Sequence, residues 1–250
     1  MLKPTEFDIN KSISLLKDDF YQKILDKPDF QVLVSIFHQS SYNYIIPKIP
    51  LENLDMKRVQ KAISTWPKSE YGFSYYIPSE LNPKENSFVK GNHLNLLYTD
   101  RYPYKQISNS QKFKLESKNI VDMSNENFDM FLKSTEICFP DWDNNKEFTT
   151  WCLNTSSITM LGVQEENNIV AFGAYMQKPN SDYVLLMNSG TLPEYRRQGL
   201  HEYIIKARIN RVLEIKKEAT FYANTEDKSG SHKGFTKLGF KNGPLYFVYE

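Results

Sequence analysis

The order of the apolar segments between residues 158 and 249 constrains the fold of this chain more than any other feature of its sequence. Three runs rich in β-branched and other apolar residues come first, and such runs are typical of β-strands. A long segment with helical periodicity, a short strand, a short helix and a last strand follow. These segments are residues 158–164, 169–177, 183–189, 199–217, 220–223, 229–238 and 245–249. Antiparallel hairpins followed by a strand–helix–strand crossover predict an α/β or α+β layered fold.

Local signals predict further details of residues 111–250. Ser124 is suited to cap a helix that begins near Phe128, and a second short helix is expected at residues 146–153. The pair Asn167-Asn168 predicts the hairpin turn between the first two strands. The long helix that follows Gly199 should bury one face of apolar residues. That face consists of Leu200, Tyr203, Ile204, Ala207 and Ile215.

The first half of the chain mixes helical and strand-like segments. Apolar residues recur at helical spacing from Ile13 to Ile24, and Pro28 should end this helix. Residues 100–114 are polar and contain Pro103, which indicates a connection between two units. The other expected elements are strands at residues 30–37, 42–46, 71–77 and 94–98 and a helix at residues 54–66. We therefore expect a smaller α+β domain at residues 1–110 and a second domain at residues 111–250.

Composition and charge narrow the class of protein. The apolar share of 40% in 250 residues is enough to build a core, which excludes disorder of the whole chain. The 31 Lys and Arg residues nearly balance the 30 Asp and Glu residues, so the net charge is +1. Proteins that bind nucleic acid or membrane surfaces usually have a basic excess. Neither partner is therefore favoured.

Cysteine content and the N-terminal segment bear on the cellular compartment. Cys138 and Cys152 are too few for a disulfide framework, and no CxxC or Cys/His cluster suggests a metal site. We expect both thiols to be small buried groups rather than nucleophiles. The N-terminal segment has no apolar signal region, and no run of about 18 apolar residues occurs. These features predict a cytoplasmic protein.

The turn from Leu192 to His201 carries the clearest chemical signal. It joins a predicted strand to a predicted helix, and it contains Arg196, Arg197 and Gly199. The first turn of a helix has unpaired backbone N–H groups and partial positive charge, so it favours a bound anion. Gly199 has no Cβ that would keep a phosphate from the backbone, and the arginines add charge. The pattern predicts a pyrophosphate site, although it is neither a Walker loop nor a Rossmann fingerprint.

This turn resembles the phosphate-binding signature of the GNAT family of N-acetyltransferases, Arg/Gln-x-x-Gly-x-Gly/Ala. Here it reads Arg196-Arg-Gln-Gly199-Leu-His201, and His201 departs from the small residue of the family. The order of elements in residues 115–250 is similar to that of the family. Residues 231–240 resemble its closing helix and Leu-Gly-Phe turn.

The resemblance implies how acetyl-CoA would bind as co-substrate. The pantetheine arm would lie where the strand at residues 183–189 splays from the strand at residues 220–223, and it would pair with the backbone of residues 188–192. The N–H groups of residues 197–201 would hold the pyrophosphate. The implied cofactor-binding residues are Gly190, Thr191, Leu192, Arg196, Arg197, Gln198, Gly199, Leu200, His201, Ser231 and Phe235.

Direct transfer to a neutral amine also needs a group that protonates the leaving thiolate. Family members often use a Tyr of the closing helix, but Phe235 occupies that position here and is expected to be a core residue. Tyr222, Ser231 and His232 are weaker candidates, and His232 is expected to be exposed and structural. The acid could equally be water, or the thiolate could leave without assistance.

Candidates for the general base lie in the segment that ends the first helix of the second domain. Glu136, Asp141 and Asp143 stand beside Phe139 and Trp142, a mixture that suits a cationic amine with an apolar stem or an ordinary surface loop. We take Glu136 as the candidate base. On the strand at residues 183–189, Asn188 and Ser189 could position water, polarise the thioester carbonyl or simply pack.

The residues and the resemblance together predict an acetyl-CoA-dependent N-acyltransferase that works by direct attack in a ternary complex. The acceptor would be a small-molecule or peptide amine. The alternative is a catalytically silent acyl-CoA sensor or scaffold on the same fold, which Phe235 and His201 keep open. Residues 1–110 could be a degenerate copy of the GNAT fold or an unrelated cap, and both a monomer and a homodimer remain open.

Overall fold

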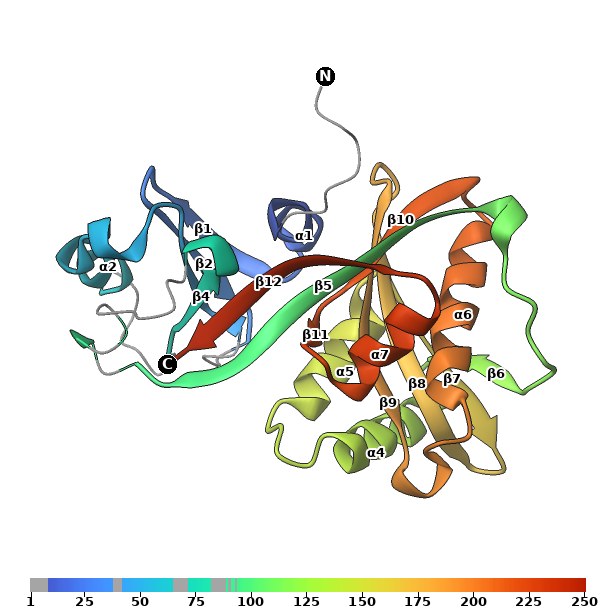
Figure 1. The fold of residues 1–250 in the computed structure, drawn as a ribbon. Helices are drawn as coiled ribbons and strands as arrows, with labels where there is room; N and C mark the ends of the chain where they lie inside the picture. The colour runs from blue at the N-terminus through green and yellow to red at the C-terminus, as the bar shows by residue number, and fades with distance from the viewer. Residues whose placement is uncertain (1–8, 38–41, 65–71, 82–88, 90, 93) are drawn as a thin grey trace. The chain divides into compact units, whose positions relative to one another are not determined.

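The computed structural model divides the chain into two compact units (Figure 1). Unit 1 comprises Met1–Leu15 and Tyr102–Gly243, and unit 2 comprises Leu16–Arg101 and Pro244–Glu250. The residues described are 9–37, 42–64, 72–81, 89, 91–92 and 94–250. Two of the three boundaries between the units fall within long strands, β5 (Leu96–Ser108) and β12 (Lys241–Tyr249), and the third falls at the end of helix α1 (Ile9–Leu16).

Unit 1 is built on a mixed, mostly antiparallel sheet. Its strand order is β5-β10-β9-β8-β7-β6, and only the pair of β10 and β9 is parallel. The strands are β6 (Ile120–Asp122), β7 (Ile158–Glu165), β8 (Asn168–Gln177), β9 (Tyr183–Thr191) and β10 (Glu218–Ala223), and the short β11 (Thr225–Glu226) pairs with β5. The hairpins and the crossover expected from residues 158–223 are thereby confirmed.

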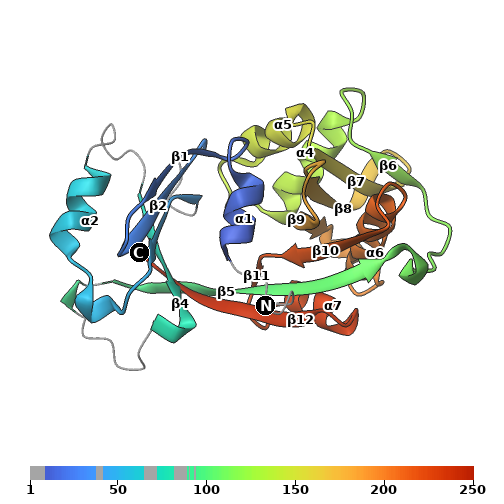
Figure 2. The same ribbon diagram turned by 90° about the horizontal axis from the view of Figure 1, so that it is seen from above.

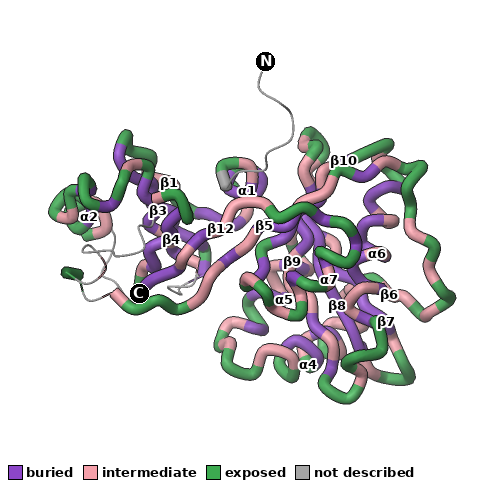
Figure 3. The backbone as a smooth tube through the Cα atoms, viewed as in Figure 1, coloured by how far each residue is buried: buried purple, intermediate pink, exposed green. Residues whose placement is uncertain are grey.

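Helices cover both faces of this sheet (Figure 2). The helices α4 (Phe128–Cys138) and α5 (Asn145–Asn154) pack on one face, while α6 (Leu200–Leu213) lies on the other and contacts β7 to β10. The short helix α7 (Gly230–Lys237) packs against α6. Strand β8 is buried along nearly its whole length because helices lie on both sides of it (Figure 3).

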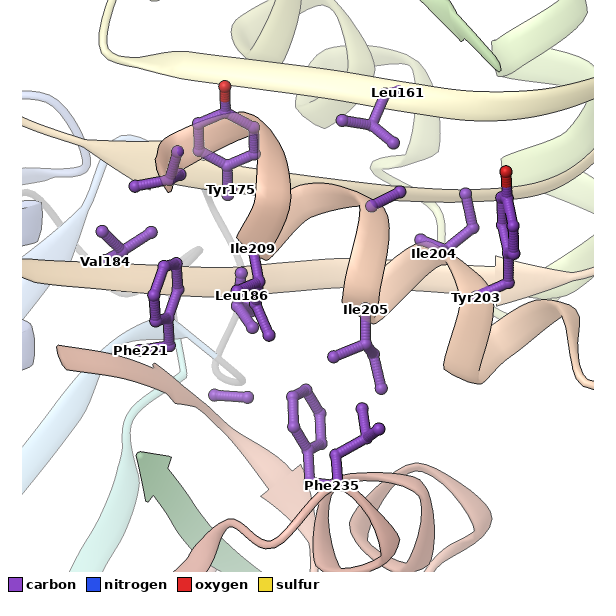
Figure 4. Packing of buried hydrophobic residues seen from close by; sticks show 14 of the residues in the cluster. Leu161, Tyr175, Val184, Leu186, Tyr203, Ile204, Ile205, Ile209, Phe221 and Phe235 are labelled. Carbon is purple, nitrogen blue, oxygen red and sulfur yellow. The ribbon is translucent and has the colours of Figure 1, made fainter. Parts of the chain in front are cut away.

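The main core of unit 1 forms between α6 and the sheet (Figure 4). Apolar side chains of α6 interdigitate with those of β7, β8, β9 and β10, and Phe235 of α7 joins the same cluster. The predicted inward residues Leu200, Tyr203, Ile204 and Ala207 are buried. Ile215 is 73% exposed, so its prediction was wrong. The reason is that α6 ends at Leu213, and the helical periodicity does not continue to residue 215.

In unit 2 the strand order is β1-β2-β3-β4-β12. Its strands are β1 (Tyr21–Asp26), β2 (Phe30–Ser35), β3 (Tyr44–Pro47) and β4 (Ser74–Pro78). The helix α2 (Met56–Ile63) connects β3 to β4, which are parallel. Asp55 caps α2 by accepting hydrogen bonds from the N–H groups of Lys57 and Arg58. Unit 2 thus contains a parallel strand–helix–strand crossover, as unit 1 does in β9–α6–β10.

The helix expected near the start of the chain was wrong in its extent. The helix predicted from Ile13 to Pro28 stops early, because α1 covers only Ile9–Leu16 and Asp18 has a φ of +75°. Residues 21–26 instead form β1, which pairs with β2. Helical spacing misled here because Phe20 faces a cluster of aromatic rings, not the next turn of a helix.

The polar segment at residues 100–114 was expected to be a connection, but residues up to Ser108 belong to β5. Backbone pairing explains why so polar a segment forms a strand. Residues 104–108 pair in register with β10, and Ile107 is buried in the core of unit 1. Pro103 lies one residue beyond that register, so its missing N–H group removes no hydrogen bond with β10.

Two local predictions in unit 1 also need correction. The N-cap of α4 is Asn127, not Ser124, and the side chain of Asn127 accepts a hydrogen bond from the N–H group of Ser124 at 2.8 Å. The β7–β8 turn consists of Glu166 and Asn167, because Asn168 already pairs with Glu165. Glu166 takes the positive φ, +52°, that a two-residue turn of this kind requires.

Candidate functional site

The candidate site begins where β9 separates from β10. The two strands pair in parallel from Tyr183 opposite Thr220 to Leu186 opposite Ala223. Strand β10 ends at Ala223, whereas β9 continues to Thr191 and pairs there only with β8. In the described part of the chain, one edge of β9 beyond Leu186 therefore has no neighbouring strand. This is the splay that the sequence resemblance implied.

A β-bulge bends β9 in this segment. Ala174 lies opposite Met187 and Phe172 lies opposite Gly190, so Gly173 faces both Asn188 and Ser189. An extra residue of this kind disrupts the ladder, bends the strand and redirects side chains. Asn188 has a φ of +45°, in the left-handed region. The two residues expected to act at the thioester are therefore the two bulged residues.

Two polar atoms beside the unpaired edge of β9 have no hydrogen-bond partner among the described residues. They are Nδ2 of Asn188 and Oγ1 of Thr191, and both are buried. Leaving such a group unsatisfied costs about 1–3 kcal/mol. A buried polar atom in this state commonly marks a place where water or a ligand completes the hydrogen bonding.

Gly190 lies between these two residues, and side chains from β8 and α4 pack closely against it. A Cβ at this position would come within 2.5 Å of Phe172 and 2.8 Å of Sγ of Cys138 at the end of α4. A larger residue would clash with these side chains, so only glycine fits here. Leu192 is 4% exposed, and its backbone is engaged, since its N–H donates to Val170 and its carbonyl accepts from Tyr195.

The turn after β9 leads directly to the start of α6. Its arginine and glutamine side chains are exposed, and Nε of Arg196 donates to the carbonyl of Thr191 at 3.2 Å. Gln198 bonds weakly to the carbonyl of Glu194, at 3.4 Å. Arg197 has a φ of +63°. The basic side chains are thus gathered around a tightly folded turn.

Gly199 is the N-cap of α6 and leaves the helix start open. Its φ is +78°, and no heavy atom lies within 4 Å of the position that a Cβ would occupy. No side chain caps the helix, so the N–H groups of its first turn have no intrahelical or capping partner. With Arg196 and Arg197 beside it, this helix start is an electropositive site with open space in front of it.

His201 lies in the first turn of α6 and is largely buried. Burial, and to a lesser extent the nearby charge of Arg208, lower the pKa of its imidazole to about 4. Nε2 of His201 is buried and has no hydrogen-bond partner among the described residues. His201 is therefore neutral near pH 7, and it brings a polar nitrogen but no charge to the start of α6.

The closing helix α7 contributes the other expected residues. Ser229 caps it by accepting from the N–H group of His232, and Ser231 in its first turn is half-buried. Phe235 is 2% exposed and lies among the buried apolar side chains of unit 1 (Figure 4). Its ring packs edge-on against Phe240 with centroids 4.9 Å apart. The core position expected for Phe235 agrees with this packing.

His232 is buried, at 7% exposed, so the expectation of an exposed residue was wrong. Its Nδ1 accepts from the N–H group of Lys228 at 2.9 Å, and its Nε2 lies 2.8 Å from Oδ1 of Asn242. Since Nδ1 accepts, the proton must be on Nε2, which donates to Asn242. Asp227 lies 3.6 Å from the same ring. These contacts fix the imidazole as a structural link between α7 and β12.

The carboxylates near the end of α4 are all on the surface. Glu136, Asp141 and Asp143 are exposed, whereas the Phe139 ring packs edge-on against Trp142 with centroids 6.1 Å apart. Nδ2 of Asn145 donates to the carbonyls of both aromatic residues and so holds the loop. Exposed carboxylates beside partly buried aromatic rings fit the second alternative from the sequence, an ordinary surface loop.

The cysteines have no features of nucleophiles. Burial raises the pKa of Cys138 to about 11 and raises that of Cys152 as well. Both are therefore neutral thiols near pH 7. Among the described residues, no group of three or more His, Cys, Asp or Glu side chains is placed to hold a metal ion. None of the described helices combines the length and apolar character that a membrane crossing needs.

Sequence reasoning missed Arg208. It is fully buried in the core of unit 1, with its guanidinium against the bulge of β8 and β9. One signal could have found it: position 208 lies four residues after Ile204 and eight after Leu200, on the apolar face of α6. A basic residue on the buried face of a helix is an exception that requires a reason.

Comparisons with known proteins agree with this geometry. Residues 124–240 match the sequence model of the Acetyltransferase (GNAT) family. A GCN5-related N-acetyltransferase from Kribbella flavida superposes with a TM-score of 0.64 at 13% identity, covering 96% of this chain and 93% of that chain. A functionally unknown conserved protein from Staphylococcus epidermidis superposes with a TM-score of 0.66 at 14% identity, covering 94% and 96%.

A tandem GNAT protein of the clavulanic acid biosynthesis pathway superposes with a TM-score of 0.55 at 8% identity, covering 88% of this chain and 77% of that chain. At such identities these likenesses show a shared fold. They extend over unit 2 as well as unit 1, which supports a GNAT-like N-terminal half. No curated protein matches the sequence.

Proposed function

Because residues 124–240 form a domain of the GNAT acetyltransferase family, we propose that this protein transfers an acetyl group from acetyl-CoA to a primary amine. The observation that carries the proposal is a continuous path in unit 1. The unpaired edge of β9 beyond Leu186 leads through the turn at residues 192–198 to the uncapped start of α6. An extended pantetheine arm and a pyrophosphate need these two features in this order.

The start of α6 would hold the pyrophosphate. Backbone N–H groups from Arg197 to His201 would donate to phosphate oxygens, and the guanidinium groups of Arg196 and Arg197 would add charge. Leu200 anchors the helix because it is buried. Gln198, which makes only one long hydrogen bond, and Ser231 at the start of α7 are further polar groups that could contact the cofactor.

The unpaired edge of β9 would hold the pantetheine arm. Pantetheine contains two amide groups, and an exposed strand edge pairs with such groups as it does with a peptide. Residues 188–191 offer backbone for this pairing, whereas Leu192 is engaged with Val170 and Tyr195 and serves as a buried wall. The unpartnered atoms of Asn188 and Thr191 are additional polar groups at this edge.

The chemistry would be direct attack of a neutral amine on the thioester in a ternary complex. Asn188 and Ser189 at the bulge would orient the thioester carbonyl and stabilise negative charge on its oxygen. Glu136, exposed on α4, is the proposed general base for the incoming amine, acting directly or through water.

Phe235, His232 and Cys138 are poor candidates for the general acid. Phe235 has no proton to donate and is packed in the core, and both nitrogens of His232 are engaged. Cys138 is a neutral thiol with a raised pKa. A thiol with a pKa near 8.5 is a tolerable leaving group as thiolate at neutral pH, so turnover does not require an acid. That these three residues are poor acids favours the second candidate function, an acyl-CoA sensor or scaffold without turnover.

Calorimetry with acetyl-CoA followed by a thiol-release assay over a library of amines separates these functions. Binding with turnover of at least one amine supports the transferase, and binding without turnover of any supports the sensor. Absence of binding contradicts both. Gly199→Val tests the site itself. Gly239→Val is the control for backbone strain, because Gly239 has a similar positive φ of +76° and its Cβ would meet mainly the flexible end of the Lys105 side chain.

A further inference from the structure

Arg208 is a cation buried without a counter-ion. Its side chain is fully buried, and among the described residues no carboxylate forms an ion pair with it. Nε donates to the carbonyl of Ile204 at 3.3 Å, and Nη1 donates to the carbonyls of Ala174 at 2.8 Å and Met187 at 3.1 Å. Nη2 has no hydrogen-bond partner in the described part of the chain. The guanidinium therefore bonds only to backbone, and two of its three acceptors belong to β8 and β9.

Those two acceptors adjoin the bulge of β9. Ala174 and Met187 are the last residues opposite each other before the register shifts at Asn188 and Ser189. A bulge disrupts the ladder and leaves backbone groups that need other partners. One guanidinium nitrogen thus ties β8 to β9 at the point where the extra residue enters.

Gly173 provides the space for this arrangement. A Cβ on Gly173 would lie 2.8 Å from Cζ and 3.0 Å from Nε of Arg208. Gly173 is also the residue that faces both bulged residues across the strand pair. The glycine of β8, the bulge of β9 and the arginine of α6 therefore form one spatial unit.

Stability alone does not explain an arginine at this position. Burying a charged group without a partner of opposite charge is unfavourable, and here burial lowers the pKa of Arg208 to about 9. Well-packed apolar side chains in place of buried charges are often neutral or stabilising. The Arg208 guanidinium is costly to bury, yet it bonds to the backbone of both β8 and β9 beside the bulge. We therefore assign it a role in fixing the geometry of β9.

We infer that Arg208 is a positioning residue of the proposed acyl-transfer site, whose guanidinium holds the backbone of β9 at the bulge and so places Asn188 and Ser189. The predicted effect on acyl transfer rests on the proposed function. It does not require Arg208 to touch either substrate. The geometry of the bulge can be measured without any acyl acceptor, which separates the two proposals.

The test compares Arg208→Met and Arg208→Lys with Arg211→Met, which removes an exposed arginine from the same helix. Arg211 forms an ion pair with Asp122 and lies outside the proposed site. Amide hydrogen exchange of the segment 184–192, calorimetric affinity for CoA, steady-state kcat and KM, and thermal melting are measured for each.

If Arg208 positions the bulge, Arg208→Met raises amide exchange in this segment by about tenfold or more, whereas Arg211→Met leaves the exchange at the wild-type rate. It lowers kcat by more than about tenfold while the affinity for CoA stays within about threefold, and Arg208→Lys recovers part of kcat. A residue with only a structural role would lower the melting temperature without changing kcat per folded molecule. Unchanged exchange and kcat in folded Arg208→Met would overturn the inference.

Gly173→Ala provides a second perturbation if Arg208→Met does not fold. The added Cβ displaces the guanidinium without removing its positive charge. Amide exchange in residues 184–192 should therefore rise again. A folded Gly173→Ala with native exchange in that segment would also contradict the inference. If the wild-type protein binds no CoA, the proposed function fails, whereas the exchange data still decide whether Arg208 holds the bulge.

Discussion

The buried imidazole of His201 should make the folded protein less stable in mild acid. Its pKa is about 4 in the folded protein against an ordinary value of 6.5, mainly because burial disfavours the charged form. The unfolded chain therefore binds a proton more readily than the folded chain between these values. This contribution to stability is fully present above pH 6.5 and is lost as the pH falls towards 4.

The two pKa values set the size of the effect. A difference of about 2.5 units corresponds to about 3 kcal/mol when both states are fully protonated. Between pH 7 and pH 5 the same values give a loss of about 2 kcal/mol from this group. In a chain of 250 residues that loss lowers the melting temperature by about 4–8 °C.

Urea or thermal unfolding of the wild type and of His201→Gln at pH 7 and pH 5 measures this effect. Gln keeps a polar side chain but has no proton to gain, so the variant should lose about 2 kcal/mol less than the wild type over this range. The difference between the two proteins removes contributions from every other titrating group. Equal losses in both proteins would show that His201 is not held neutral by burial.

Three further predictions concern the proposed site. Gly199→Val should weaken acetyl-CoA binding more than about tenfold, or about 1.4 kcal/mol, in calorimetry, whereas Gly239→Val, at a similar positive φ, should not. Calorimetric titration should give one CoA per chain, since the cofactor motif occurs only in unit 1, and two equivalent sites would contradict this assignment. Phe235→Leu should lower stability in urea unfolding by about 1–2 kcal/mol through lost packing. Its kcat per folded molecule should not change, and a large loss of kcat at native stability would place the ring at the reaction.

The arrangement of the second half of the chain could be predicted because its signals are local. Strand-forming runs, a helical period and a glycine at the start of a helix depend on neighbours within a few residues. The crossover from β9 through α6 to β10 is built from such segments, and the same local chemistry identified Gly199 and the two arginines beside it. A resemblance carried by these residues is accordingly confirmed by the family comparison.

Errors arose where pairing partners distant in sequence decide the structure. Residues 100–108 are too polar to read as a strand, yet pairing with β10 makes them one. Residues 21–26 have an apolar spacing compatible with a helix, yet they pair with β2. A short segment carries both periodicities at once, and its partner selects between them.

The bulge could not be predicted for the same reason. The place of Arg208 on the apolar face of α6 was a local signal that the sequence analysis overlooked, and both features bear on the location of the site. Local rules disfavour a positive φ at Asn188, a buried arginine without a counter-ion and buried polar atoms without partners. Folded sequences satisfy such rules in most places and depart from them mainly at functional sites. In unit 1 several of these departures lie in β9 and in α6. They support our proposal that the reaction centre lies at the bulge, close to the phosphate-binding turn.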